Sequence, residues 1–305
     1  AALGRSLRAG EAKEIEQRIV EAKKQLAVRD RKAYMQMPET QRLVEAGKLV
    51  SESLQAEFAK KQQRLALDML AVQRAKADIE ANKQLSPLHV INRMLAAFND
   101  GKSQVQSIDS QARSIATLAK SMMLDVIDAT KGKWLGMAND VEMNRDIVRE
   151  LHGTDTGNGV AAKAAKQFQE VAETLRERFN RAGGDVGKLE DWAMPHVHSA
   201  FKVAKAGRDA WVNDILPMIN RDRYVNEDGS PMTDAQVREF LNESYLSIAT
   251  DGANKVEAGQ FTGGGKRSNR GSESRVLHFK GGDEWLAYQA KYGEGDLLQI
   301  MMGHI

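Results

Sequence analysis

The chain has 305 residues, 42% of them hydrophobic and 28% charged, so it is long enough to bury a sizeable core and too apolar for a disordered protein. Its formal net charge of +2 excludes a chain that binds polyanions through overall charge alone. The absence of cysteine excludes disulfide scaffolds, cysteine nucleophiles, iron–sulfur clusters and thiolate zinc sites.

The composition predicts a mainly α fold, with long amphipathic helices that form an arm, a helical domain and a loop-rich C-terminal part. Proline is scarce, and Ala, Lys, Glu, Gln and Arg, which lose least on entering a helix, are abundant. No apolar run approaches the roughly 20 residues of a transmembrane helix, and no secretory signal opens the chain. No fixed-period repeat is present, so a solenoid is not expected.

Residues 1–85 are predicted to form a long helical arm or hairpin. Apolar residues spaced 4-3-4 from Ile15 to Leu26 predict a helix over 11–37, which Pro38 ends or bends. A second helix over 39–83 would span roughly 65 Å if unbroken. Its apolar stripe is Leu43, Gly47, Val50, Leu54, Phe58, Leu65, Met69, Val72 and Ile79.

A helix of that length is longer than a compact domain usually contains, so its stripe needs a partner helix, either from the same chain or from a neighbouring copy. We expect the second arrangement. The predicted oligomer interface comprises Leu54, Phe58, Leu65 and Met69.

Residues 86–184 are predicted to form a helical bundle. Ser86 is placed to cap a helix with Pro87 in its first turn. Further helices are expected over 104–131, up to Gly153, and over 160–181. The stripe of the 104–131 helix is expected to be Val105, Ile108, Ile115, Leu118, Met122 and Val126.

Residues 185–305 are predicted to be a mixed helical, loop-rich segment. Thr233 is placed to cap a helix that ends near Thr250. The Gly/Ser-rich, basic stretch Gly259–Arg275 is expected to be a mobile loop. "VLHFK" is a candidate strand, and "GGDEWLAYQAKYGEGD" a short helix between glycines.

The pair His196 and His198 is the candidate metal site. Imidazoles two residues apart share one face of a strand but point about 200° apart on a helix. Zinc needs three or four ligands, and the spacing does not choose among Glu190, Asp191, His152 and His278 for the others. We therefore favour a structural turn in which Trp192 and Pro195 pack against helices and the histidines hydrogen-bond to the backbone.

Lys266, Arg267 and Arg270 of the glycine-rich stretch are candidates for contact with a phosphate backbone. The same stretch does not fit a P-loop, because Gln260 stands where the first glycine belongs and Arg267 where Ser or Thr belongs. The acid pairs Glu190/Asp191 and Asp283/Glu284 are adjacent in sequence and diverge on any regular element, so we expect no acid–base pair there.

Two C-terminal stretches resemble the large internal virion proteins, or DNA-ejection proteins, of tailed bacteriophages. The first contains Trp192, Pro195, His198 and Trp211, and the second is "RVLHFKGGDEWLAYQAKYGEGDLLQIMMGHI". The second is similar to the pattern R-x-L-x-F-K-x-x-x-x-W-x-x-Y-x-x-x-x-G. The residues that match it are Arg275, Leu277, Phe279, Lys280, Trp285, Tyr288 and Tyr292-Gly293, followed by Gly303-His304-Ile305. The resemblance covers about residues 185–305, whereas residues 1–184 match only in style.

The resemblance implies a non-enzymatic fragment, without cofactors, that oligomerises into part of a channel conducting the genome across the host envelope. It implies a homo-oligomeric ring or tube, other phage ejection or portal proteins, non-specific double-stranded DNA and the host envelope as partners. The expected location is the capsid interior and then the host periplasm. A start at Ala1 and an end within an apolar helical pattern lead us to read the chain as part of a longer protein.

Two alternatives stay open. One is a portal- or tail-associated structural protein that remains in the virion. The other is a metal-dependent hydrolase that uses His196 and His198.

Overall fold

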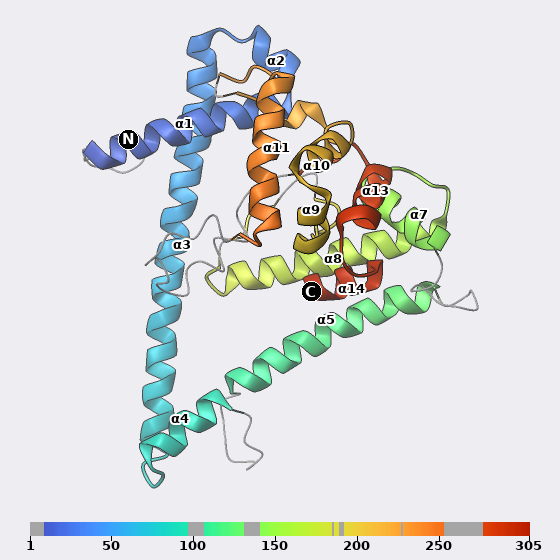
Figure 1. The fold of residues 1–305 in the computed structure, drawn as a ribbon. Helices are drawn as coiled ribbons and strands as arrows, with labels where there is room; N and C mark the ends of the chain where they lie inside the picture. The colour runs from blue at the N-terminus through green and yellow to red at the C-terminus, as the bar shows by residue number, and fades with distance from the viewer. Residues whose placement is uncertain are drawn as a thin grey trace.

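The computed structural model describes residues 9–96, 107–130, 141–184, 186–188, 192–226, 228–252 and 277–305. These residues form twelve α-helices, one short 3-10 helix and three isolated β-bridges, without a strand (Figure 1). The predicted mainly α fold is confirmed. None of the described helices is long and apolar enough to cross a membrane.

The helix boundaries, in chain order, are α1 (Ala9–Arg29), α2 (Arg31–Gln36), α3 (Glu39–Ala81), α4 (Pro87–Leu95), α5 (Ile108–Thr130), α7 (Val141–Leu151), α8 (Gly159–Arg181), α9 (Ala200–Ala206), α10 (Arg208–Ile215), the 3-10 helix (Arg221–Arg223), α11 (Asp234–Ala249), α13 (Gly282–Tyr292) and α14 (Leu297–His304).

The N-terminal helices form the predicted arm, with one difference. The helix expected over 11–37 is divided at Asp30, whose backbone is extended and whose carboxylate accepts a hydrogen bond from the amide of Ala33, capping α2. Beyond Pro38, α3 runs for 43 residues, and α1 crosses it steeply (Figure 1). The crossing buries Ala46 and Val50 of α3.

A loop of the C-terminal part fastens the α1–α2 end of this arm to the rest of the molecule. Arg31 forms a 2.8 Å ion pair with Asp222 of the 3-10 helix. Gly229, at φ +79°, lies directly against Tyr34, whose ring is buried. A Cβ at position 229 would lie 2.5 Å from Tyr34 Cε1 and 2.9 Å from Ala27 Cβ.

We therefore expect Gly229→Ala to destabilise the protein more than Gly252→Ala. Both glycines have positive φ, which costs other residues about 1–2 kcal/mol, but nothing lies within 4 Å of a Cβ added at Gly252. Gly229→Ala must also displace Tyr34, which we expect to cost about 1–3 kcal/mol more. Urea denaturation of the two variants measures the difference. Equal losses in the free energy of unfolding would show that Tyr34 can move aside at no cost.

Helix α4 turns the chain between α3 and α5, which diverge from it (Figure 1). Ser86 caps α4 as predicted, with its hydroxyl 3.3 Å from the amide of His89. Inside the turn, the buried Arg93 donates to Asn82 Oδ1 at 3.2 Å.

The stripe predicted for α5 is only partly buried. Ala119, Met123 and Val126 enter the core, whereas Ile108 and Leu118 are exposed. Ile108 lies on the buried face, but α5 packs into the core only from Ala119 onward, where it lies against α8. Leu118 lies off that face. Val105 lies outside the described residues.

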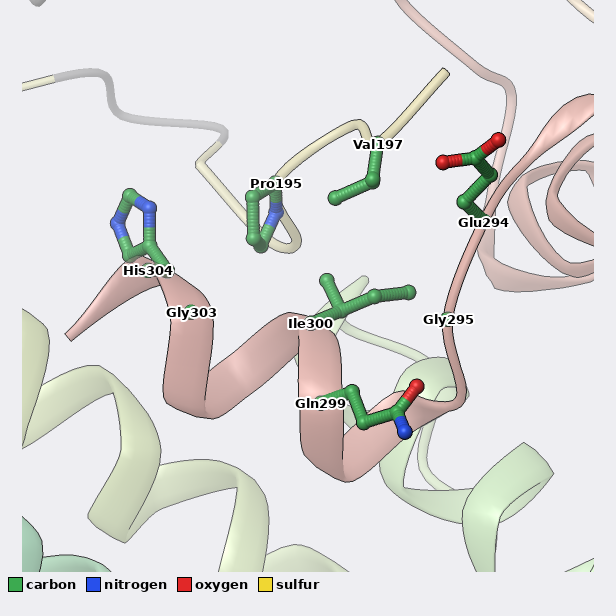
Figure 2. Close-up of a pocket in the computed structure, with 8 residues that line it drawn as sticks. All are labelled: Pro195, Val197, Glu294, Gly295, Gln299, Ile300, Gly303 and His304. Atoms are coloured by element: carbon green, nitrogen blue, oxygen red, sulfur yellow. The ribbon is translucent and has the colours of Figure 1, made fainter. Parts of the chain in front are cut away.

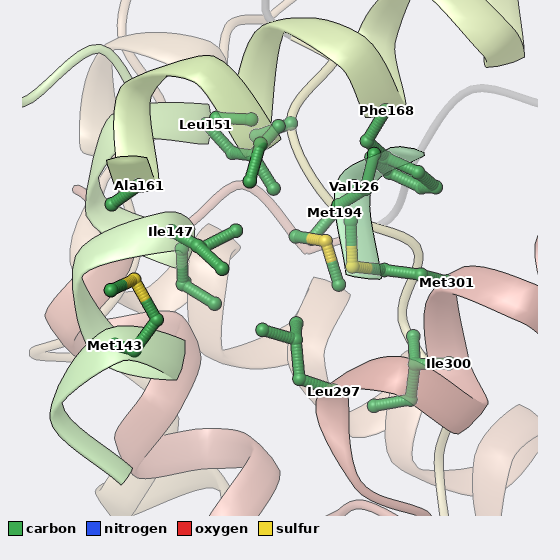
Figure 3. Packing of buried hydrophobic residues seen from close by; sticks show 14 of the residues in the cluster. Val126, Met143, Ile147, Leu151, Ala161, Phe168, Met194, Leu297, Ile300 and Met301 are labelled. Atoms are coloured by element: carbon green, nitrogen blue, oxygen red, sulfur yellow. The ribbon is translucent and has the colours of Figure 1, made fainter. Parts of the chain in front are cut away.

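The larger core gathers helices from both sides of the boundary predicted at residue 185. Figure 3 shows side chains of α7, α8 and α14 converging with Met194. The members of this core that are labelled in Figure 3 are Val126, Met143, Ile147, Leu151, Ala161, Phe168, Met194, Leu297, Ile300 and Met301. One apolar cluster therefore joins the segments 107–184 and 185–305.

A second core lies among α9, α10, α11 and α13. It contains Trp211 and Ile215 of α10, Leu241 of α11 and Tyr288 of α13. The segment "VLHFK" contributes no strand in the described residues. Instead, Phe279 forms one isolated antiparallel bridge with Ile219.

Candidate functional site

The central part of α3 carries an exposed apolar surface. Every residue from 55 to 74 is exposed in the chain. Successive residues of an α-helix turn by about 100°, so Phe58, Leu65, Met69 and Val72 lie within about 60° of one another. We call these four residues the α3 stripe. Phe58 is 62%, Leu65 57% and Met69 58% exposed.

Leu54 differs from the other predicted interface residues. It is partly buried and packs against the cluster that α1 and α3 form around Ala22, Ala46 and Val50. Its neighbours therefore belong to the same chain. The expected burial of Phe58, Leu65 and Met69 against another subunit stays a prediction.

The rest of the molecule approaches α3 from the side opposite the α3 stripe. Gln63 and Arg64 lie about 140° and 240° from Phe58 around the helix. Gln63 Nε2 donates to the carbonyl of Arg181 at the end of α8, at 3.2 Å. A Cβ added to Gly183 would lie 3.6 Å from Arg64 Cγ. The α3 stripe therefore faces away from α8 and is open to a partner.

Residues 195–199, which we call the histidine segment, run extended beside the turn that follows α13. His198 forms an antiparallel bridge with Gly293, and the amide of Ser199 donates to the carbonyl of Tyr292 at 2.8 Å. The Ser199 hydroxyl donates to Glu294 Oε1 at 2.6 Å. These bonds join two of the stretches that carry the resemblance.

Within this segment, His198 hydrogen-bonds to a side chain, whereas a backbone partner was expected. Its Nδ1 lies 2.7 Å from the Tyr288 hydroxyl, with the two rings nearly perpendicular. Burial lowers the pKa of His198 to about 4 and raises the pKa of Tyr288. A neutral imidazole held by a phenol fits a structural role. Trp192 packs as expected, stacked on Phe168 with centroids 5.6 Å apart.

The extended backbone does bring the rings of His196 and His198 together, with centroids 5.8 Å apart. No group of three His, Cys, Asp or Glu side chains that could hold a metal ion is found in the described residues. The ring of His196 also makes a T-shaped contact with the ring of Phe279, with centroids 5.2 Å apart. The described geometry thus offers two imidazoles and no third ligand. Glu190 and Asp191 lie outside the described residues.

A shallow groove of about 410 Å³ lies between the histidine segment and α14 (Figure 2). Ile300 lies between its two polar ends, and Pro195 and Val197 form the opposite wall. Glu294 and His304 lie at opposite ends of the groove, so they do not form an acid–base pair (Figure 2).

The remaining sequence candidates are not brought together. Asp283 of α13 forms an ion pair with Arg149 of α7, with Oδ1 and Nε 2.8 Å apart. This ion pair gives Asp283 a structural role. The phosphate-contact candidates Lys266, Arg267 and Arg270 lie outside the described residues.

Sequence reasoning missed the side-chain cluster around Asp214. Lys291 and Tyr292 of α13 both donate to Asp214 Oδ2 of α10, and these bonds hold the pKa of Asp214 below its usual range. The partners are 77 and 78 residues apart in the chain, so no local motif could reveal them.

Comparison with protein-family models, with curated proteins and with solved structures finds no match to this chain.

Proposed function

We propose that the chain is a self-assembling fragment of a phage internal virion protein, one that is ejected with the genome and forms part of its conduit across the host envelope. The exposed α3 stripe carries this proposal. Four large apolar side chains exposed along one helix face favour a partner, because burying them against another copy removes apolar surface from water. The resemblance of residues 185–305 supplies the biological setting.

The occupant of the α3 stripe is a second copy of the chain. A closed ring or tube needs a head-to-tail interface, in which two different surfaces of each subunit meet. Helix α4 offers the complementary surface, because Leu88, Ile91 and Leu95 lie along one exposed face at helical spacing. In this arrangement, the stripe of one copy packs on α4 of the next.

Sedimentation of the 305-residue chain tests the proposal. We expect concentration-dependent oligomers for the wild type and monomers for Phe58→Glu/Leu65→Glu, because two buried carboxylates cost far more than the contact gains. Phe201→Glu is the matched control, since Phe201 of α9 is 73% exposed and lies outside both surfaces. A compact wild-type monomer at high concentration would contradict the proposal.

A mixing experiment distinguishes head-to-tail contact from symmetric pairing of two stripes. Leu88→Glu/Ile91→Glu removes the α4 surface and leaves the α3 stripe intact. Mixed with Phe58→Glu/Leu65→Glu, it should restore one interface and yield a mixed dimer. If the α4 variant alone associates like the wild type, the stripe pairs with something other than α4.

A further inference from the structure

The junction of α3 and α8 concentrates positive charge. Lys60, Lys61 and Arg64 are exposed on α3, and Arg178 and Arg181 are exposed on the last turns of α8. The helices meet at this point, where Gln63 Nε2 donates to the carbonyl of Arg181 and Gly183 lies against Arg64. We call these five cations the basic junction.

Few acids offset this charge. Lys61, Arg64, Arg178 and Arg181 form no ion pair within the described part of the chain. Two of the nearby carboxylates are already in ion pairs with other cations. Arg18 pairs with Glu57, and Arg176 and Lys188 both pair with Glu173. Among the described carboxylates on these turns of α3 and α8, Glu177 and Asp68 remain beside Lys61, Arg64, Arg178 and Arg181.

The clustering of cations on α3 does not stabilise the helix itself. Arg64 follows Lys60 by four residues and Lys61 by three, spacings at which like charges repel on a helix surface. The basic residues of α8 suit a helix C-terminus, where they complement the helix dipole. Those of α3 lie in mid-helix, and the fold adds the α8 pair beside them.

We propose that the basic junction is a binding site for the phosphate backbone of duplex DNA. Cations that displace the counterions of a polyphosphate gain affinity without reading sequence. An anionic membrane fits less well. Lys60 and Arg64 lie about 200° and 240° from Phe58 around α3, and only Lys61, at about 300°, borders the α3 stripe. A bilayer that met the α3 and α8 cations together would therefore leave most of the stripe facing away from lipid.

The site is distinct from Lys266, Arg267 and Arg270. The inference rests on the proposed function only in taking DNA as the polyanion. Lys60, Arg64 and the two α8 cations lie away from the α3 stripe, and Lys61 lies at its edge, so one molecule can use both surfaces at once.

Fluorescence anisotropy with a short labelled duplex of arbitrary sequence, over a range of KCl concentrations, tests the site. Each phosphate contact contributes about 0.9 to the slope of log K against log salt. Lys61→Gln/Arg64→Gln and Arg178→Gln/Arg181→Gln should each reduce the slope by about 1.8. The control Arg29→Gln/Lys120→Gln removes the same charge from exposed positions on α1 and α5, and should leave the slope unchanged.

An unchanged slope in both junction variants overturns the site, as does a wild type that binds vesicles of anionic lipid and not the duplex. Sedimentation of the same variants separates this outcome from failure of the assembly. Junction variants that assemble normally but keep the wild-type slope overturn only the DNA site. A normal change in slope in a chain that never assembles overturns only the proposed conduit.

Discussion

Phe168→Ala should lower the free energy of unfolding by about 3–5 kcal/mol, a large share of the 5–15 kcal/mol that usually holds a domain together. Phe168 is fully buried on α8 and stacks on Trp192. Its cluster also contains side chains of α5, α7, α13 and α14, so the cavity would weaken all of them together. Chemical denaturation followed by circular dichroism and by tryptophan fluorescence measures the loss.

The two probes should report one shared transition. Tryptophans lie in both cores, with Trp285 in the larger and Trp211 in the smaller, whereas circular dichroism follows every helix. Phe201→Ala is the matched control, because its ring is 73% exposed and its removal should change stability by no more than about 0.5 kcal/mol. Separate transitions for the two probes would show that the cores fold independently.

Helix positions could be predicted well from sequence where local signals were strong. The helix expected over 160–181 spans Gly159–Arg181, and Thr233 caps a helix that ends at Ala249. In both, apolar spacing and a capping side chain act within a few residues, so the sequence contains the whole signal. Asp30 shows the limit, because its cap interrupts a continuous stripe that pattern alone extends.

Contacts between distant segments could not be predicted in the same way. His198 and Tyr288 are 90 residues apart, and only the fold shows that a phenol is the histidine's partner. The exposure of Ile108 depends equally on where α5 leaves α8.

The α3 stripe and the basic junction differ in the same way in how far the sequence reveals them. Periodicity reveals the α3 stripe, because four apolar residues on one helix need no tertiary information to share a face. The basic junction is visible only in half, as Lys60-Lys61 and Arg64, until the structure places Arg178 and Arg181 beside them. A surface made by one helix can be read from sequence, whereas a surface made by two requires their packing.

His198 should make the stability of the protein depend on pH below neutrality. Burial lowers its pKa to about 4 in the folded state, whereas an unfolded histidine titrates near 6.5. Between these values the unfolded chain binds a proton that the folded chain excludes, so stability is full above about pH 7 and falls as the pH drops toward 4. The accumulated loss is on the order of 3 kcal/mol.

His198→Asn separates this effect from other titrating groups. An asparagine side chain places an amide atom near the position of Nδ1, where it can still bond the Tyr288 hydroxyl, but it does not titrate. We expect urea midpoints of the variant to change less than those of the wild type between pH 7 and pH 4.5. His89→Asn, at an exposed position of α4, should follow the wild-type curve. If His198→Asn follows it as well, protonation of His198 does not oppose folding, and the imidazole is accessible to water despite its packing against Tyr288.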